Sequence, residues 1–486
     1  MKPQQRFATR LARAGLFSLT TIALLSACGG SGTTGTGTGA GNTPNTVASS
    51  EDGTVGTISG FGSVIVNGVR YDDSSATVKD DFGSSLSTSR LGLGMTVHLR
   101  GKSNDDGTGS ASGINVFSEL QGPISALNAS AGTFSLFGIS VIVDAKTVFA
   151  DASGLAALSN GNVVEIYGLR SGNTVTASRI ERKTPGAGEA VVKLRGAITG
   201  LNTSASTFNL AGLVVSFSGA QVTPSNSSLT EGGFVAVSST SSPSGTTLTA
   251  NRVVALGSRS FTFDDSAKSE LEGVISGFTS VSQFTVAGIT VNASNAVFVR
   301  GTVGSLANGG RVEIKGSFSN NVLTARLVKF EDSQSLDEFE LHGAVSNFTS
   351  LSNFTLRGIK VDASGAGVLF ERGVAANIAN GRQLEVEGSL QSSANGSILK
   401  ATKVKFEDSS SSSGSSSGAG EFEFRGRIIS LTGNTLVIGT RTVNLTSSTV
   451  FRRIARAQLV AGVLLEIKGT LLANGNVDAE RISLED

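Results

Sequence analysis

The chain repeats one short motif six times, and this repetition constrains its fold more than any other feature. The copies begin at positions 56, 122, 196, 273, 343 and 426 and read GTISGF, GPISAL, GAITGL, GVISGF, GAVSNF and GRIISL. Recurrence of one pattern along a chain indicates a single structural unit used several times. The 486 residues are therefore expected to fold as tandem copies.

Each copy carries further markers that predict short β-strands. A glycine with alternating apolar residues on both sides, as in LFGISVIVDA, predicts a tight hairpin. A run such as VEIYG, VEIKG, LEVEG or LEIKG follows, and a closing segment such as TASRIE ends the copy. Period-2 alternation dominates throughout, so each unit of roughly 65 residues is expected to hold five strands, with a turn or short helix before the fourth.

This element order predicts an all-β chain of six tandem small five-stranded OB-like barrel domains joined by short linkers. A compact β-sandwich is the alternative, and a solenoid is less favoured because each unit has enough apolar positions for its own core. The 62 glycines, 26 phenylalanines and absence of Trp agree with β-rich cores and many turns. The predicted repeats span 54–118, 119–182, 193–256, 269–332, 339–408 and 421–486, with a Ser/Gly linker at 409–420.

The N-terminal 27 residues have the pattern of a cleaved signal peptide. Four basic residues precede an apolar stretch from Leu16 to Leu25 that is too short to span a bilayer. The sequence Leu25-Ser-Ala-Cys28 resembles the lipobox of bacterial lipoproteins, which implies cleavage between Ala27 and Cys28 and acylation of Cys28. An ordinary signal peptide with a nearby free thiol is the alternative. Residues 28–53 are rich in Gly and Thr and are expected to form a disordered, lipidated tether.

These features predict a partner and a location. Two or three acyl chains anchor a protein stably, so we expect attachment to a membrane rather than a membrane span. Gly29 follows the cysteine in place of the retention-signal Asp of many Gram-negative lipoproteins, which by that resemblance implies the outer membrane.

Nucleic acid is not expected as a partner. Removal of the signal peptide takes away four of the 39 basic residues and leaves 35 against 38 acidic ones, whereas phosphate binding needs clustered Lys and Arg. The one local basic cluster, Arg452, Arg453 and Arg456, is interpreted as a solvated face.

The repeats resemble a known family. The segment GTISGFGSVIVNGVRYD, the GxxVEIxG pattern and the lipobox together are similar to the domain-of-unknown-function 5666 family, found as tandem copies in bacterial lipoproteins. The resemblance covers residues 54–486 apart from linkers and is weaker in the third unit, where GGFVAVSSTS lacks the closing glycine. The family has no assigned chemistry, so the resemblance implies no catalytic residues.

A recurring acid in the fourth strand is the strongest candidate for chemistry. Glu165, Glu313, Glu385 and Glu466 occupy this position, which holds His98 in the first unit and Ala236 in the third. We interpret the acids as members of cross-strand ion pairs on a solvent face rather than as catalytic groups. The expected pairs are Glu165 with Arg179, Glu385 with Lys403 and Glu466 with Arg481, and Leu327 breaks the pattern for Glu313.

The sequence gives little evidence for other arrangements typical of active sites. His98 and His342 are the only histidines, both in ordinary strand positions, and a single cysteine argues against zinc or a cysteine nucleophile. Acidic groups are interpreted as solvated turns and linkers, with calcium binding as the alternative. They comprise Asp105, Asp106, Asp264, Asp265, Glu331, Asp332, Asp337, Glu338 and Glu340. Paired glycosidase-type carboxylates would need a pocket that such small units build with difficulty.

The sequence therefore predicts a non-catalytic lipoprotein of the bacterial cell envelope, without metal or cofactor. Its β-domains would serve as a spacer or a protein-interaction surface. The alternative is a module that binds glycans or peptides, and an enzyme is the third possibility. Exposed aromatic rings that stack on a ligand would distinguish a binding module from a spacer. The chain has no Trp, only Tyr71 and Tyr167, and Phe residues at core-type positions, which favours the spacer.

Overall fold

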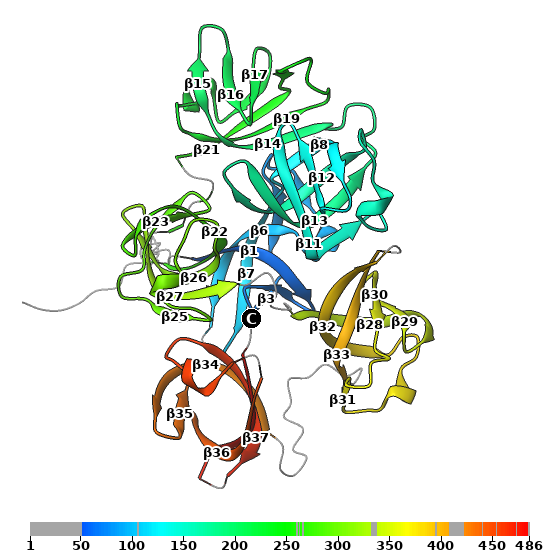
Figure 1. Ribbon diagram of the computed structural model, residues 1–486, viewed down its shortest axis with the longest axis vertical. Helices are drawn as coiled ribbons and strands as arrows, with labels where there is room; N and C mark the ends of the chain where they lie inside the picture. The colour runs from blue at the N-terminus through cyan, green and yellow to red at the C-terminus, as the bar shows by residue number, and fades with distance from the viewer. Residues whose placement is uncertain are drawn as a thin grey trace, which may run out of the picture. The chain divides into compact units, whose positions relative to one another are not determined.

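The described part of the chain is all-β, as the sequence predicts (Figure 1). The computed structural model describes residues 51–104, 106–258, 261, 263–264, 267–331, 338–393, 396–407, 422–439, 441–452, 454–472 and 474–484. Within these residues the only helical elements are short 3-10 turns, and no helix is long and apolar enough to cross a membrane. The predicted signal peptide, its cleavage site at Ala27 and Cys28, the tether to residue 50 and the linker 409–420 lie outside the described residues.

The strands fall into successive sets, and we number the repeats by these sets. Repeat 1 contains β1 (Asp52–Phe61), β2 (Val64–Val66), β3 (Val69–Asp72), β4 (Thr77–Asp80), β5 (Ser85–Leu86), η1 (Thr88–Arg90), β6 (Thr96–Ser103) and β7 (Thr108–Phe117). Repeat 2 contains β8 (Leu120–Pro123), β9 (Ser125–Asn128), β10 (Thr133–Leu136), β11 (Ile139–Ala150), η2 (Leu155–Ala157), β12 (Val163–Ser171) and β13 (Thr174–Lys183). Repeat 3 contains β14 (Val192–Ala197), β15 (Thr199–Asn202), β16 (Thr207–Leu210), β17 (Leu213–Ser216), β18 (Gln221–Thr223), η3 (Asn226–Ser228), β19 (Phe234–Ser239), β20 (Thr247–Thr249) and β21 (Arg252–Gly257).

The later repeats have the same order of elements. Repeat 4 contains β22 (Lys268–Ser280), β23 (Gln283–Val286), β24 (Ile289–Asn292), β25 (Val297–Val299), η4 (Val303–Ser305), β26 (Arg311–Ser319) and β27 (Val322–Glu331). Repeat 5 contains β28 (Glu338–Ser350), β29 (Asn353–Leu356), β30 (Ile359–Asp362), β31 (Leu369–Glu371), η5 (Ala375–Asn377), β32 (Gln383–Ser393) and β33 (Gly396–Phe406). Repeat 6 contains β34 (Phe422–Thr432), β35 (Thr435–Ile438), β36 (Arg441–Arg452), η6 (Arg456–Gln458), β37 (Leu464–Leu471) and β38 (Val477–Leu484). The 3-10 turn before the fourth strand stands where the sequence predicts a turn or short helix.

The predicted hairpin glycine takes a backbone conformation that other residues rarely adopt. In repeat 2, Phe137 and Gly138 both have positive φ, at 53° and 80°, and they connect β10 to β11. Two consecutive residues with positive φ form the type I′ turn that matches the twist of a two-residue hairpin. Equivalent residue–glycine pairs with positive φ occur in repeats 1, 3, 4 and 5, so the glycine marker fixes the same strand register each time.

The glycine that closes the fourth strand has a different role. At Gly168 the pairing of β12 with β13 shifts by one residue, which is a β-bulge. A Cβ at Gly168 would lie 2.2 Å from the carbonyl oxygen of Thr176, and at Gly316 the corresponding distance to Thr324 is 2.1 Å. The third repeat has Ser239 near this position, and the pairing of β19 with β21 shifts elsewhere, between Phe234 and Val235.

Within a repeat the strands pair in one order. The first pairs with the second and the second with the third, the third runs parallel to the fifth, and the fourth pairs with both the fifth and the first. In repeat 6 these pairings close a barrel with the order β34-β35-β36-β38-β37, drawn in orange and red in Figure 1. In repeat 3 the strands divide between two sheets.

The sheets do not stop at the repeat boundaries. The first strand of repeat 1, β1, pairs in parallel with β22 of repeat 4 through Gly53 and Ser269, and with β28 of repeat 5 through Gly60 and Glu340. Repeats 1, 4 and 5 thus share a 19-stranded sheet, and β8 pairs with β14 to join repeats 2 and 3. The expectation of six separate barrels joined only by linkers is therefore wrong, because the edges of the first strands pair across repeats. The repeats stack in a solenoid-like way, a possibility that the sequence had disfavoured.

The hydrophobic cores also continue between repeats. One cluster contains buried side chains of repeats 1 and 5, and another combines repeats 2 and 3. Val299 and Leu327 of repeat 4 pack in the core cluster of repeat 6. Side chains on the outer faces of one repeat are thus covered by another repeat, and many of the charged residues described below lie at these covered faces.

Candidate functional site

The recurring glutamates are buried rather than exposed to solvent. Glu165, Glu313, Glu385 and Glu466 expose between 2% and 4% of their surface. The prediction that they lie on a solvent face is therefore wrong. The physical reason is the stacking of repeats, which covers the face of the fourth strand that an isolated unit would expose.

The glutamates are paired with cations, but the partners differ in part from the predicted ones. Glu313 lies opposite Lys329 and Glu385 lies opposite Lys405, each with a 2.9 Å contact between oxygen and Nζ. The glycine bulge shifts the register by one residue, and the predicted partners lie opposite the residue two positions after the glutamate. This explains why Leu327 interrupted the expected pattern: it lies opposite Lys315.

Each predicted pair has its own outcome. The pair of Glu466 with Arg481 is confirmed, at 3.2 Å. Lys403 lies 4.0 Å from Glu385, farther than Lys405 does. The predicted pair of Glu165 with Arg179 is wrong, because Arg179 binds Glu181 and Glu165 contacts two lysines, as described below.

These ion pairs decide the protonation of the buried acids. Burial by itself would raise the pKa of Glu313, but the neighbouring Lys315 and Lys329 lower it to about 2. Burial likewise opposes ionisation of Glu165 and Glu466, and their cationic partners lower the pKa of each carboxyl to about 2. The acids are therefore ionised at neutral pH. A general acid would need the opposite shift of pKa.

Some of the buried ion pairs connect different repeats. Arg427 of repeat 6 lies 3.2 Å from Glu270 of repeat 4, and Glu270 also lies 3.4 Å from Lys315. Lys315 in turn contacts Glu313 at 2.6 Å. A row of alternating charges thus connects repeat 6 with the buried glutamate of repeat 4. Elsewhere Lys468 of repeat 6 lies 3.4 Å from Glu371 of repeat 5.

His98 takes the glutamate position in repeat 1 and is a core residue. Its ring lies 5.7 Å from those of Phe261 and Phe263, with edge-on geometry toward both. Burial, followed by the charges of Arg100 and Arg195, lowers the pKa of His98 to about 4. The imidazole is therefore neutral at physiological pH and only weakly basic.

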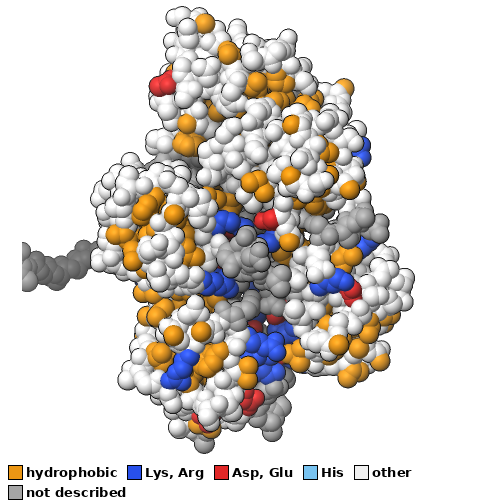
Figure 2. Space-filling model, viewed as in Figure 1, with side chains coloured by type: hydrophobic (Ala, Val, Ile, Leu, Met, Phe, Trp, Pro, Cys, Tyr) orange, Lys and Arg blue, Asp and Glu red, His pale blue; other side chains and the backbone are white. Residues whose placement is uncertain are grey.

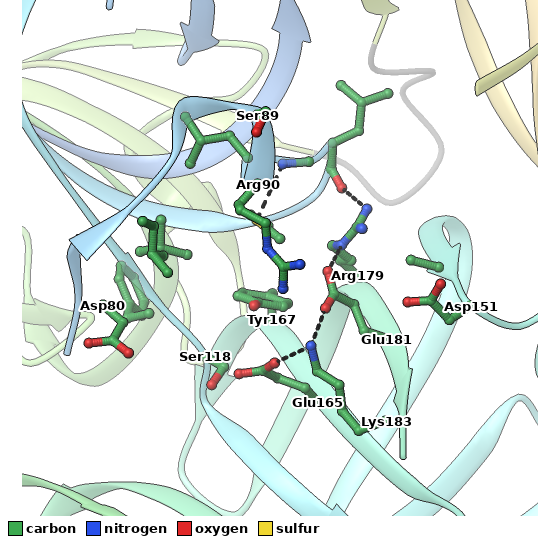
Figure 3. Close-up of a pocket in the computed structure, with 18 of the residues that line it drawn as sticks. Asp80, Ser89, Arg90, Ser118, Asp151, Glu165, Tyr167, Arg179, Glu181 and Lys183 are labelled. Carbon is green, nitrogen blue, oxygen red and sulfur yellow. Dashed lines mark hydrogen bonds and ion pairs between the residues drawn. The ribbon is translucent and has the colours of Figure 1, made fainter. Parts of the chain in front are cut away.

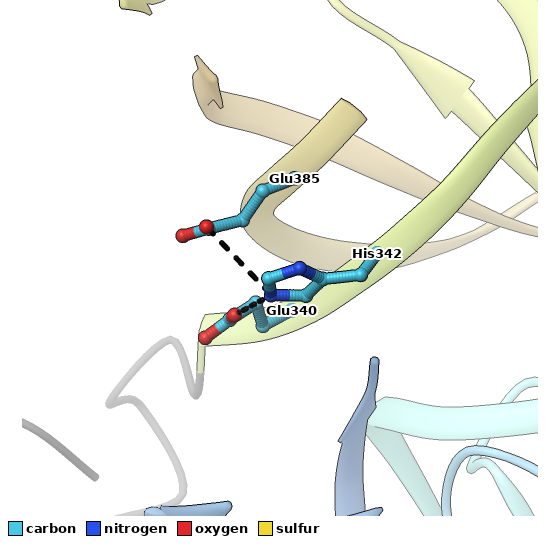
Figure 4. Close-up of side chains that lie close together, drawn as sticks. All are labelled: Glu340, His342 and Glu385. Carbon is cyan, nitrogen blue, oxygen red and sulfur yellow. Dashed lines mark hydrogen bonds and ion pairs between the residues drawn. The ribbon is translucent and has the colours of Figure 1, made fainter. Parts of the chain in front are cut away.

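The structure brings three potential metal ligands together at the contact between repeats 1 and 5. Glu340, His342 and Glu385 offer ligand atoms within 4.8 Å of one another (Figure 4). His342 Nε2 contacts Glu340, and His342 Nδ1 lies 3.1 Å from Glu407. Glu340 and His342 come from β28 and Glu385 from β32, which are paired strands. Sequence reasoning missed this cluster because Glu385 lies 43 positions after His342 in the chain.

A cation already occupies the centre of this cluster. The Arg70 guanidinium contacts Glu340, and its Nη1 lies 2.9 Å from His342 Nε2. Although burial disfavours the imidazolium, hydrogen bonds to Glu340 and Glu407 raise the pKa of His342 to about 9. A protonated imidazole cannot bind a metal ion, and metal ligation requires its neutral form. The arrangement fits an ion-pair cluster better than a metal site.

A polar cavity of about 820 Å³ lies between repeats 1, 2, 3 and 5 (Figure 3). A row of ion pairs from repeat 2 crosses its wall: Lys183 contacts Glu165 at 2.9 Å and Glu181 at 2.6 Å, and Arg179 contacts Glu181 at 2.6 Å. Lys193 of repeat 3 contacts Glu165 at 2.6 Å. The cavity lies in the size range of small-molecule sites, and nothing in the sequence pattern of one repeat predicts it because it forms between repeats.

The remaining predicted acids and bases lie in ordinary surroundings. Asp106 accepts hydrogen bonds from the backbone and hydroxyl of Thr108, and Asp264 accepts one from the backbone of Glu51. Glu331 contacts Lys329 at 2.9 Å and its side chain is 9% exposed, and that of Glu340 is 11% exposed, so the interpretation of these two acids as solvated is wrong. Arg452 and Arg456 are exposed, and blue side chains form several separate groups on the face drawn in Figure 2. Asp105, Asp265, Asp332, Asp337, Arg453 and the side chain of Glu338 lie outside the described residues.

The fold and the buried ion pairs define the chain as an all-β protein of stacked tandem repeats. The profile of the family described as Domain of unknown function (DUF5666) matches residues 52–115, 121–181, 272–329, 342–405 and 425–483, more than half of the chain. The chain belongs to this family. The matched segments omit the third repeat, which lacks the closing glycine. The comparison with curated proteins found no match.

Proposed function

We propose that the protein is a lipid-anchored component of the bacterial cell envelope, with stacked repeats that serve as a non-catalytic spacer or protein-interaction surface. The observation that carries this proposal is the set of buried ion pairs between repeats, such as Arg427 with Glu270. Burying a charge is costly unless it meets its partner with good geometry. Such pairs therefore favour one arrangement of the repeats over alternatives, which is what a spacer or a docking surface of fixed shape requires.

Within each repeat we infer an OB-like unit. The order in which the first, second, third, fifth and fourth strands pair supports this interpretation, and so does the 3-10 turn before the fourth strand. OB-like units commonly bind their ligands through an exposed sheet face. Here other repeats cover part of those faces, which favours a structural role for them.

Attachment to the membrane rests on residues 16–28. An apolar stretch followed by Leu25-Ser-Ala-Cys28 fits a lipoprotein signal, and acylation of Cys28 would anchor the chain. Gly29 favours the outer membrane by resemblance to other lipoproteins. The Gly- and Thr-rich segment that follows would hold the repeats away from the lipid headgroups.

The proposal is tested on the full chain by two measurements. Cys28→Ser should move the protein from the membrane to the soluble fraction, and continued membrane association would contradict lipid anchoring. Small-angle scattering should show a larger radius of gyration for Arg427→Ala combined with Glu270→Ala than for the exposed control Arg182→Ala. Unchanged dimensions would contradict a fixed array held by buried charges.

A further inference from the structure

We propose that the cavity between repeats 1, 2, 3 and 5 binds a neutral oligosaccharide. Its volume of about 820 Å³ fits within the range of 300–1,000 Å³ typical of ligand sites. This binding role goes beyond a spacer and does not depend on the anchoring of the chain, so the two proposals can fail separately.

The charge of the cavity selects against a strongly charged ligand. Six basic and five acidic residues line it, so the formal charges almost cancel. The acids Glu165 and Glu181 are each held between two cations, as described above. Arg195, a further lining cation, lies 3.5 Å from Asp81. Neither an anion nor a cation would find a large uncompensated charge on this wall.

The same wall retains hydrogen-bonding capacity. A carboxylate can accept about four hydrogen bonds and an ammonium can donate three. Among the described residues, the ion pairs of Lys183 are with Glu165 and Glu181, and those of Glu181 are with Lys183 and Arg179. Donors and acceptors therefore alternate along the wall with capacity to spare. Sugar hydroxyls, which donate and accept at once, match such a row.

Two charged side chains without a described partner flank the row. Arg90, in η1 of repeat 1, and Asp151, after β11 of repeat 2, are both exposed cavity residues with no side-chain hydrogen bond or ion pair among the described residues. Figure 3 shows Arg90 above Tyr167 and Asp151 on the opposite side of Arg179 and Glu181. They belong to different repeats, so a ligand that contacts both would connect repeat 1 with repeat 2.

Aromatic rings complete the site. Phe82, Phe117, Phe149 and Tyr167 contribute to the lining, and Tyr167 lies centrally among the labelled charged groups in Figure 3. Phe117, Phe149 and Tyr167 are 4%, 7% and 5% exposed, so they form a packed apolar part of the wall, and apolar walls with a few polar groups are usual in small-molecule sites. Tyr167 is one of the two tyrosines of the chain, and it lines this cavity.

The test uses the full chain, extracted with a detergent that has no sugar headgroup. Titration calorimetry would measure binding of chitotetraose, maltotetraose and cellotetraose, with inorganic phosphate and tetragalacturonate as charged comparators. We expect at least one neutral tetrasaccharide to bind with a Kd that changes less than twofold between low and high salt, since screening affects only charged partners.

Variants locate the binding. Arg90→Ala and Asp151→Asn should each weaken binding at least about fivefold, because each removes a charged hydrogen-bonding group. Arg182→Ala, an exposed residue of β13 outside the cavity lining, and Asp106→Asn should change Kd less than twofold. Because Arg90 and Asp151 are exposed, the variants are expected to fold, and their melting temperatures check this. The proposal is overturned if no neutral tetrasaccharide binds at millimolar concentration, if only the charged comparators bind, or if neither variant weakens binding.

Discussion

Replacing Glu313 by glutamine should destabilise repeat 4 strongly, although the side chain keeps its shape. Glu313 is 3% exposed and contacts Lys315 at 2.6 Å and Lys329 at 2.9 Å, and both lysines are 6% exposed. Removal of one member of a buried ion pair costs about 3–5 kcal/mol, because the other charge stays buried. Lys315 retains Glu270 and Lys329 retains Glu331, so we expect the lower end, about 3 kcal/mol.

The assay has a global and a local part. Repeats 1, 4 and 5 share one sheet, so they are expected to melt together as a unit of about 150–250 residues, which loses about 2–4 °C per kcal/mol; the transition should therefore fall by about 6–12 °C. Hydrogen exchange should locate the loss of protection in β26 and β27, and β12 of repeat 2 should keep its protection. Glu480→Gln, an exposed acid in β38, serves as the matched control and should change stability by less than about 0.5 kcal/mol.

A double variant tests the reason for the loss. Glu313→Leu with Lys329→Met removes the buried pair as a whole, leaving Lys315 with Glu270 and Glu331 with Arg300. Hydrophobic replacement of a complete buried pair is often neutral or stabilising, so stability should return to within about 1 kcal/mol of the native chain. A Glu313→Gln variant as stable as the native chain, or a double variant less stable than the single one, would refute the argument.

Two further predictions concern the cluster at the repeat 1–repeat 5 contact and the glycine bulge. The raised pKa of His342, about 9 against 6.5, should contribute stability that is fully present below pH 6.5 and is lost as pH rises through 9. His342→Gln should remove this dependence, about 3 kcal/mol, in melting temperatures measured across that range, and an unaltered pH profile would contradict the assignment. Gly316→Ala should destabilise β26 and β27 by about 1–3 kcal/mol, because the new Cβ would lie 2.1 Å from the carbonyl oxygen of Thr324. Chemical denaturation would measure this, with the exposed Ser317→Ala as control, and equal losses in both variants would count against the bulge.

The sequence predicts local structure well because its markers act locally. Glycine before Ile139 predicts the hairpin, and period-2 alternation predicts the strands, since both depend on neighbouring residues. The burial of Glu165 and Glu313 could not be predicted in this way. Alternation tells which residues share a face, but another repeat, distant in sequence, decides whether that face is covered.

The candidate sites are less predictable for the same reason. Arg70 meets Glu340 across 270 positions of sequence, and no single-repeat pattern contains both. His342 occupies a position that holds Gln121, Arg195, Glu272 and Arg425 in other repeats, so its cluster looks like an ordinary polar site. The cavity likewise combines residues from several repeats. The residues of the cluster and of the cavity are brought together only by the contacts between repeats.

The parallel pairing of β1 with β22 and β28 has a consequence for biosynthesis. The partners of Gly53 and Gly60, Ser269 and Glu340, follow more than 200 residues later in the chain. Contacts between such distant segments form slowly, and strand edges are prone to aggregation until they are paired. β1 must therefore remain incompletely paired until β28 of the fifth repeat has been made, so the pairing of β1 is expected to be completed late in folding.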